Sequence, residues 1–283
     1  MGKRGILAAL AASASALTLA AVAIAVPVDP DIVDLQAGGG DAIFDVSNET
    51  GTCPGGADCV FAIDDGTGFG STDAFDGGLV LTVGGRAFAD FDGSGDLTGQ
   101  QLRVGPTTLG GVKVTRVERG LPGSPTLRSL VTLKNTKRKP VRRTVVLGSA
   151  MGSDSDTEVI RSSSGDLALD ASDRWAITSD EPLGGSPSDP PVTFVNYGKG
   201  RVLKTVAASL VPSDSDSFVF AAYKVRLGSK QTRHLLFYTE FGDEHADAIQ
   251  RANKFNRKRL SGALKNGIAR NVQKKILNWD LVG

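Results

Sequence analysis

Apolar and polar positions alternate with a period of two through much of the chain, most clearly between residues 127 and 157. In this stretch Val131 and Leu133 fall on one side, and polar residues such as Lys134 fall on the other. Side chains alternate between the two faces of a β-strand, so the pattern predicts a sheet with one buried face. Residues 141–147 alternate in the same way. The stretch therefore predicts two strands joined by a basic turn.

The same pattern recurs on both sides of this stretch, with turn-forming residues between the segments. Gly84 and Gly85 separate strands expected at 79–83 and 86–90, and two glycines suit the positive φ angles of a tight hairpin turn. Further strands are expected at 42–46, 60–63, 101–104, 112–119, 158–161, 167–169, 174–178, 192–197, 201–209, 217–227 and 232–240. No helical segment separates them before residue 243, which excludes parallel crossovers. The predicted fold is mostly β, a large antiparallel β-sandwich on the scale of a supersandwich.

The period changes near the C-terminus. Asp243 can cap a helix, and Ala246, Ile249, Ala252 and Phe255 then recur at helical spacing. We expect one or two amphipathic α-helices within residues 243–279, packed over the sandwich, and Trp279 buried as an anchor for the tail.

The first 25 residues predict a secretory signal peptide. Lys3 and Arg4 precede an apolar run over residues 6–25, and Ala23 and Ala25 fit the small-x-small cleavage pattern. An uncleaved membrane anchor is the alternative, and the remainder has no second apolar segment of spanning length. We therefore expect a protein that is secreted or associated with the cell surface. Its flexible N-terminal arm would cover residues 26–40, and a single β-sandwich domain would cover 41–283.

Two cysteines, Cys53 and Cys59, lie six residues apart in a segment rich in Gly and Pro. In an exported chain this spacing predicts a disulfide, worth roughly 2 kcal/mol for so small a loop. A metal pair is the alternative, but no further Cys and no nearby His would complete a zinc site.

Charge is unevenly distributed, although the whole chain carries a net charge of only +1. Eleven acidic residues lie between Asp29 and Asp76, and no Lys or Arg occurs from residue 26 until Arg86. The central stretch carries a basic patch of six residues: Lys134, Lys137, Arg138, Lys139, Arg142 and Arg143. It has two interpretations, a solvated hairpin end that guards a sheet edge and a binding surface for polyanions. Nucleic acid is not expected as a partner, because the basic residues lack interleaved aromatic side chains.

One loop has the spacing of a calcium site. Asp90, Asp92 and Ser94 stand at positions one, three and five, Gly95 stands at the sharp turn, and Asp96 follows. The pattern resembles the loop of EF-hand and dockerin modules over these residues only. It departs at position twelve, where Gln101 replaces the bidentate carboxylate. Calcium is therefore one interpretation and an ordinary Asp-Gly turn is the other; no other cofactor is expected.

Catalytic signatures are scarce. The chain has two histidines, His234 and His245, and no G-x-S-x-G motif, so no catalytic residue is assigned. Loop carboxylates could serve a glycosidase, yet no pair stands out.

Five sequence segments carry a resemblance to a known family. In chain order they are LVTLKNTKRKPVRRTVVLGSAMGSD, SSSGD, DRWAIT, HLLFYTEFGDEHADAIQRA and ILNWDL. Over residues 73–281 they are similar to a β-rich module of large exported bacterial proteins. That family has no assigned activity, so the resemblance implies export and a β-sandwich and carries over no functional residue.

Two functional hypotheses follow. The first is a non-catalytic binding or structural module at the cell surface, with a glycan or an anionic polymer as its partner. The alternative is a carbohydrate-active enzyme on a supersandwich like that of galactose mutarotase, a fold-level analogy. Two carboxylates facing each other across a deep cleft lined by Trp175 or Tyr197 would favour the enzyme, and a flat, exposed aromatic surface would favour binding.

Overall fold

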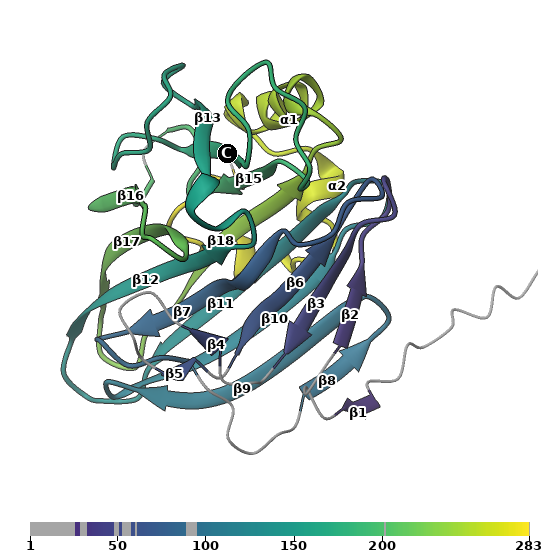
Figure 1. Ribbon diagram of the computed structural model, residues 1–283. Coiled ribbons are helices and arrows are strands. Elements are labelled where there is room, and N and C mark those ends of the chain that lie inside the picture. Colours follow the sequence, from purple (N-terminus) through teal and green to yellow (C-terminus); the bar gives the residue numbers. More distant parts are fainter. Residues whose placement is uncertain are drawn as a thin grey trace, which may run out of the picture.

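Two large antiparallel sheets pack face to face in the computed structural model of the protein, and short helices cover one outer face (Figure 1). The structure describes residues 26–28, 33–47, 51–52, 58–59, 61–88, 95–200 and 202–282. The expected signal peptide lies outside these residues. The predicted antiparallel β-sandwich with C-terminal helices is confirmed.

The first sheet has nine strands. In spatial order they are β1 (Val26–Val28), β8 (Gly95–Thr98), β9 (Gln101–Leu109), β10 (Val112–Gly120), β11 (Thr126–Asn135), β18 (Thr232–Phe241), β15 (Val192–Val195), β14 (Trp175–Ser179) and β13 (Glu158–Ser162). Each neighbouring pair is antiparallel.

The second sheet has seven strands. In spatial order they are β16 (Ala207–Val211), β17 (Ser217–Leu227), β12 (Val141–Met151), β7 (Phe75–Val83), β6 (Ala62–Thr67), β3 (Ile43–Ser47) and β2 (Val33–Gln36). A separate small ribbon pairs β4 (Gly51–Thr52) with β5 (Asp58–Cys59). A 3₁₀ turn, η1 (Asp154–Asp156), follows β12.

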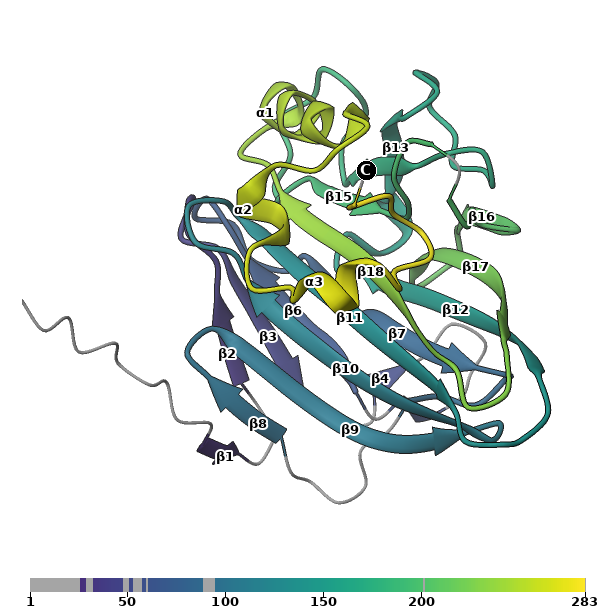
Figure 2. The ribbon, with the colours of Figure 1, turned by 180° about the vertical axis from the view of Figure 1, so that it is seen from behind.

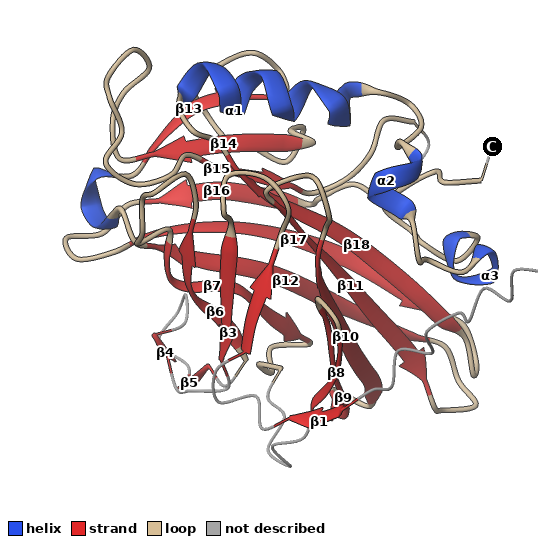
Figure 3. Ribbon diagram, turned by 90° about the vertical axis from the view of Figure 1, so that its right-hand side faces the viewer, coloured by secondary structure: helices blue, strands red, loops and turns tan. Residues whose placement is uncertain are grey.

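The main core lies between the two sheets (Figure 3). Alternate residues of each strand point inward, as the period-two pattern predicts. Phe241 of β18 stacks on Phe44 of β3, with ring centroids 4.5 Å apart, so the two sheets are joined by direct aromatic contact. The predicted Gly84–Gly85 turn is also confirmed, with φ angles of 63° and 74° and a hydrogen bond from Val83 N to Arg86 O.

A second core lies on the outer face of the nine-stranded sheet, under the C-terminal segments (Figure 2). These are α1 (His245–Ala252), η2 (Asn253–Asn256), α2 (Gly262–Lys265) and α3 (Arg270–Gln273). Trp279 is buried as predicted, and its Nε1 donates to Leu236 O at 2.7 Å. On α1 Ala252 is buried as predicted, but Ala246 is exposed and Ala248 is buried in its place. No helix of the described residues is long and apolar enough to cross a membrane.

Two predictions about organisation are wrong. The strands at 127–157 do not form a hairpin, because β11 pairs with β10 and β18 while β12 pairs with β17 and β7 in the other sheet. The basic connection therefore crosses from sheet to sheet over one end of the sandwich. The arm at 26–40 includes two strands, and Leu35 of β2 is fully buried because it packs into the main core.

A polar layer interrupts the main core. Arg116 of β10 has a fully buried side chain, and its Nη2 lies 2.8 Å from Glu118 Oε1. Arg116 Nη1 also donates to Leu79 O of the opposite sheet at 2.9 Å, and its guanidinium carbon lies 4.6 Å from the centroid of Phe61. Glu118 accepts a further bond from Ser129 Oγ, whereas its Oε2 has no hydrogen-bond partner among the described residues. Arg116 therefore joins the two sheets through its hydrogen bond to Leu79 O and its contact with the Phe61 ring.

Candidate functional site

The predicted basic patch lies at one end of the sandwich, where four connections between strands meet. Asn135, at the end of β11, donates to Lys139 O at 2.8 Å and to Gly228 O at 2.7 Å. Lys230 Nζ, from the β17–β18 turn, donates to Thr136 O. The β7 turn joins them, because Gly84 N donates to Thr144 O at 2.8 Å. These bonds hold the basic connection against its neighbours, and we call this region the basic end.

Arg143 plays a different role from the other five residues of the patch. Its Nε donates to Gly110 O at 2.8 Å and its Nη1 donates to Arg142 O at 2.7 Å. Gly110 belongs to the β9–β10 turn of the opposite sheet, so Arg143 joins the two sheets at the basic end. Its guanidinium is committed to backbone carbonyls.

The remaining cations of the basic end have no acidic partner within the described residues. The four ion pairs found there join Arg103 to Asp96, Arg116 to Glu118, Arg251 to Asp247 and Lys254 to Glu240. Two like-charged pairs even face each other across strands, Arg142 opposite Arg226 and Lys113 opposite Lys134. Direct opposition of like charges destabilises a sheet. The fold therefore retains a cluster of positive charge that it does not neutralise.

The edge-guarding interpretation fits this arrangement only in part. Arg142 and Arg226 lie in β12 and β17, which are inner strands along most of their length. A groove of about 410 Å³ opens beside them, lined by Arg142, Arg143, Thr144, Lys224, Val225 and Arg226. Lys224 and Arg226 were not predicted for the patch, because only the pairing of β17 with β12 brings them there.

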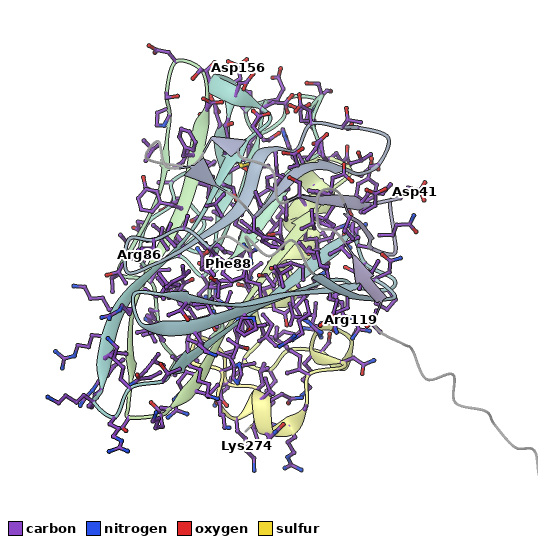
Figure 4. All side chains as sticks on the ribbon, turned by 90° about the horizontal axis from the view of Figure 1, so that it is seen from below. Asp41, Arg86, Phe88, Arg119, Asp156 and Lys274 are labelled. Atoms are coloured by element: carbon purple, nitrogen blue, oxygen red, sulfur yellow. The ribbon has the colours of Figure 1, made fainter. Side chains whose placement is uncertain are left out.

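Acidic side chains gather elsewhere, on the outer face of the other half of the seven-stranded sheet. Asp34 faces Asp45 across β2 and β3, and Asp45 faces Asp65 across β3 and β6. Burial raises the pKa of Asp45 to about 6, and repulsion from Asp34 and Asp65 adds to the effect. In Figure 4, Asp41 and Arg86 stand on opposite sides of the molecule.

A second acidic group was missed by sequence reasoning. Asp76, Asp154 and Asp216 place carboxylate oxygens within 4.8 Å of one another, although they come from β7, η1 and the turn before β17. Burial and the neighbouring carboxylates raise the pKa of Asp76 to about 6. Such a group could hold a divalent cation, but carboxylates on a surface also gather without one. No local sequence pattern signals it, because its members are far apart in the chain.

The calcium and disulfide predictions fall largely on residues that the structure does not describe. Asp90, Asp92, Ser94 and Cys53 lie outside the described residues, and only the backbone of Cys59 is described, in β5. Asp96 lies in β8, where its Oδ2 is 3.4 Å from Arg103 Nη1. Both sites stay predictions.

The two histidines are held in structural contacts. His245 Nδ1 accepts a hydrogen bond from Gly184 N, so the neutral ring carries its proton on Nε2, which donates to Ser179 Oγ at 3.0 Å. The ring therefore cannot take a proton from Ser179. Burial lowers the pKa of His234 to about 4, with Lys275 and Arg233 nearby, and its Nδ1 lies 3.0 Å from Thr132 Oγ1.

The tryptophan and tyrosine side chains are all buried. Trp175, Trp279, Tyr197, Tyr223 and Tyr238 are each at most 4% exposed. Trp175 Nε1 donates to Asn256 Oδ1 and Tyr197 OH donates to Ser172 O, so both polar groups are satisfied inside the protein. Neither residue offers a face for stacking on a sugar.

Comparisons with known proteins give a structural likeness only. No family model matches the chain, and no curated protein matches its sequence. Among solved structures, it is similar to a "putative aldose 1-epimerase" from Klebsiella pneumoniae subsp. pneumoniae, with a TM-score of 0.45 and 11% identity. The alignment covers 76% of this chain and 81% of that one. A likeness of this size does not carry an activity from one protein to the other.

Proposed function

We propose that the protein is an exported, non-catalytic binding module that holds an anionic polymer, such as an acidic glycan, at the cell surface. The observation that carries this proposal is the basic end, whose cations have no acidic partners among the described residues. Positive charge that the fold leaves uncompensated at one end attracts polyanions and raises their rate of association.

Two further observations support this choice. The tryptophans and tyrosines are buried, which disfavours a neutral sugar held by stacking and favours recognition by charge. The hydrogen bonds of His245 leave it unable to activate Ser179, which favours binding over acyl-transfer chemistry. The carbohydrate-active enzyme stays an alternative at the level of fold.

The test compares two triple variants of the purified secreted protein. Lys137, Arg138 and Lys139 form an exposed run at the basic end, and Arg257, Lys258 and Arg259 form a matched exposed run after η2. Retention would be measured on a sulfated polysaccharide, a polyuronate and a polyphosphate, with neutral dextran as a control. We expect all three polyanions to be retained, with affinity falling steeply as NaCl increases.

Replacing the first run with alanines should weaken polyanion binding about tenfold at low salt, because rim charges govern encounter and long-range attraction. The same replacement in the second run should change binding little. Equal losses in both variants, or equal retention on dextran, would contradict the proposal.

A further inference from the structure

The ends of β12 and β17 form a two-stranded ribbon that projects beyond their neighbours. The two strands pair from Val141 opposite Leu227 to Met151 opposite Ser217. The β7 ladder begins only at Val145, and β16 reaches only Ala222. In the ladder, the first residues of β12 are therefore paired with β17 alone. The inner face of this ribbon packs into the main core through Val225 and Leu227, and its outer face is exposed.

The outer face of the ribbon carries two rows of side chains. In the first row Arg142 is opposite Arg226, and in the second Thr144 is opposite Lys224. Opposed residues in an antiparallel pair have Cβ atoms about 5 Å apart, and rows two residues apart are separated by about 7 Å. Two oxyanions spaced by that distance would each meet a row with cationic or hydroxyl donors.

The floor of the groove is fixed while its cations are free. Arg143 is bound to Gly110 O and to Arg142 O, which holds the ribbon against the opposite sheet. No hydrogen bond or ion pair engages the side chains of Arg142, Lys224 and Arg226 within the part of the chain that the structure describes. A positioned groove with uncommitted donors is suited to bind a ligand at low cost in conformational entropy.

From this arrangement we infer that the groove is a discrete subsite for two neighbouring oxyanion groups of one polymer, either sulfate, phosphate or carboxylate. The inference rests on the proposed polyanion function. It identifies the part of the protein that selects polymers by the spacing of their charged groups. The arginine pair takes one oxyanion through its planar forks, which match the geometry of these groups. Lys224 and Thr144 take the next.

The probes are short, so that they reach the groove without spanning the basic end. A disulfated disaccharide, a monosulfated disaccharide and tripolyphosphate would be titrated into the full secreted protein at fixed ionic strength. Binding would be followed by calorimetry and by amide chemical shifts in β12 and β17. We expect the disulfated sugar to bind at least tenfold more tightly than the monosulfated one, with shifts centred on the ribbon. Tripolyphosphate shows whether phosphate replaces sulfate.

Arg226→Gln removes one half of the like-charged pair and should weaken the disulfated probe at least tenfold. The matched control is Lys134→Gln, which removes one half of the other like-charged pair, on the outer face of the nine-stranded sheet. It should leave the short probe unaffected. Arg226→Gln should also raise the Tm by about 1 °C without ligand, because repulsion is relieved; a fall of several degrees would mean that the fold itself needs Arg226.

Two failures are distinguishable. If long polyanions bind but the short probes do not, or if Arg226→Gln and Lys134→Gln have equal effects on them, the subsite is wrong and the broader function stands. If no polyanion binds at all, both fail.

Discussion

At the scale of single residues, the ion pair between Arg116 and Glu118 is the contact with the largest predicted effect on stability. Glu118→Gln keeps the shape of the side chain but leaves the Arg116 cation uncompensated in the core. A charge stranded in this way costs about 3–5 kcal/mol. We expect urea unfolding to show a loss in this range.

The double variant Arg116→Met with Glu118→Leu is the control, because it removes both charges and keeps the volume. Replacement of a buried pair by apolar residues is often neutral or stabilising, so most of the loss should be recovered. A Glu118→Gln protein within about 1 kcal/mol of the wild type would contradict the argument.

Burial of apolar residues could be predicted from the sequence, whereas burial of this pair could not. Trp279 was expected to anchor the tail, and it does. Arg116 and Glu118 occupy inward positions of a regular alternation, but a charged residue at such a position normally indicates an exposed face. Their burial is made tolerable by residues outside β10: Leu79 O and Phe61 contact Arg116, and Ser129 of β11 donates to Glu118.

At the scale of elements, Asn135 is the residue that organises the basic connection between β11 and β12. Its side chain donates to Lys139 O and Gly228 O and accepts from Lys137 N at 2.9 Å, and it is fully buried. Asn135→Ala leaves the carbonyls of Lys139 and Gly228 and the N–H of Lys137 without this partner. We expect a loss of about 2–4 kcal/mol, measured by urea unfolding.

A second measurement on the same variant shows where in the structure the stability is lost. Because Asn135 joins two connections of the basic end, Asn135→Ala should also raise amide hydrogen exchange at residues 136–139 and 228–231. Thr136→Ala changes an adjacent side chain that makes no hydrogen bond in the described structure, and should have little effect. Equal exchange rates in the two variants would contradict the role assigned to Asn135.

The strands could be predicted from local patterns, but their pairing could not. The period of two places β11 and β12 correctly, while the turn chemistry of Asn135 and Pro140 fits both a hairpin and a crossing between sheets. The choice depends on partners far along the chain, namely β18 for β11 and β17 for β12. For the same reason the six-residue basic patch was predicted, whereas Lys224 and Arg226 were not.

At the scale of the whole molecule, charge is segregated between the basic end and the acidic faces. The acidic faces have a consequence for pH that follows from the raised pKa values. Burial first, and then the neighbouring carboxylates, raise the pKa of Asp45 and of Asp76 from 3.8 to about 6. Between these values the folded protein keeps protons that the unfolded chain has lost. Stability from this source is therefore present below about pH 4 and is lost as the pH rises towards 6.

Asp45→Asn and Asp76→Asn should each stabilise the protein at pH 7.5 and change little at pH 3.5, because the amide never acquires the repelled charge. Both side chains are partly solvated, so screening keeps each gain below about 1 kcal/mol. Thermal unfolding at the two pH values measures the effect.

Asp166→Asn is a control for which the opposite effect on stability is expected, since hydrogen bonds from Ser162 and Ala168 lower the pKa of Asp166. Its stability contribution is present at neutral pH and is lost on acidification, so this variant should be less stable at pH 7.5. Destabilisation of all three variants at pH 7.5 would show that the clustered carboxylates are favourable as anions, contrary to the repulsion argued here.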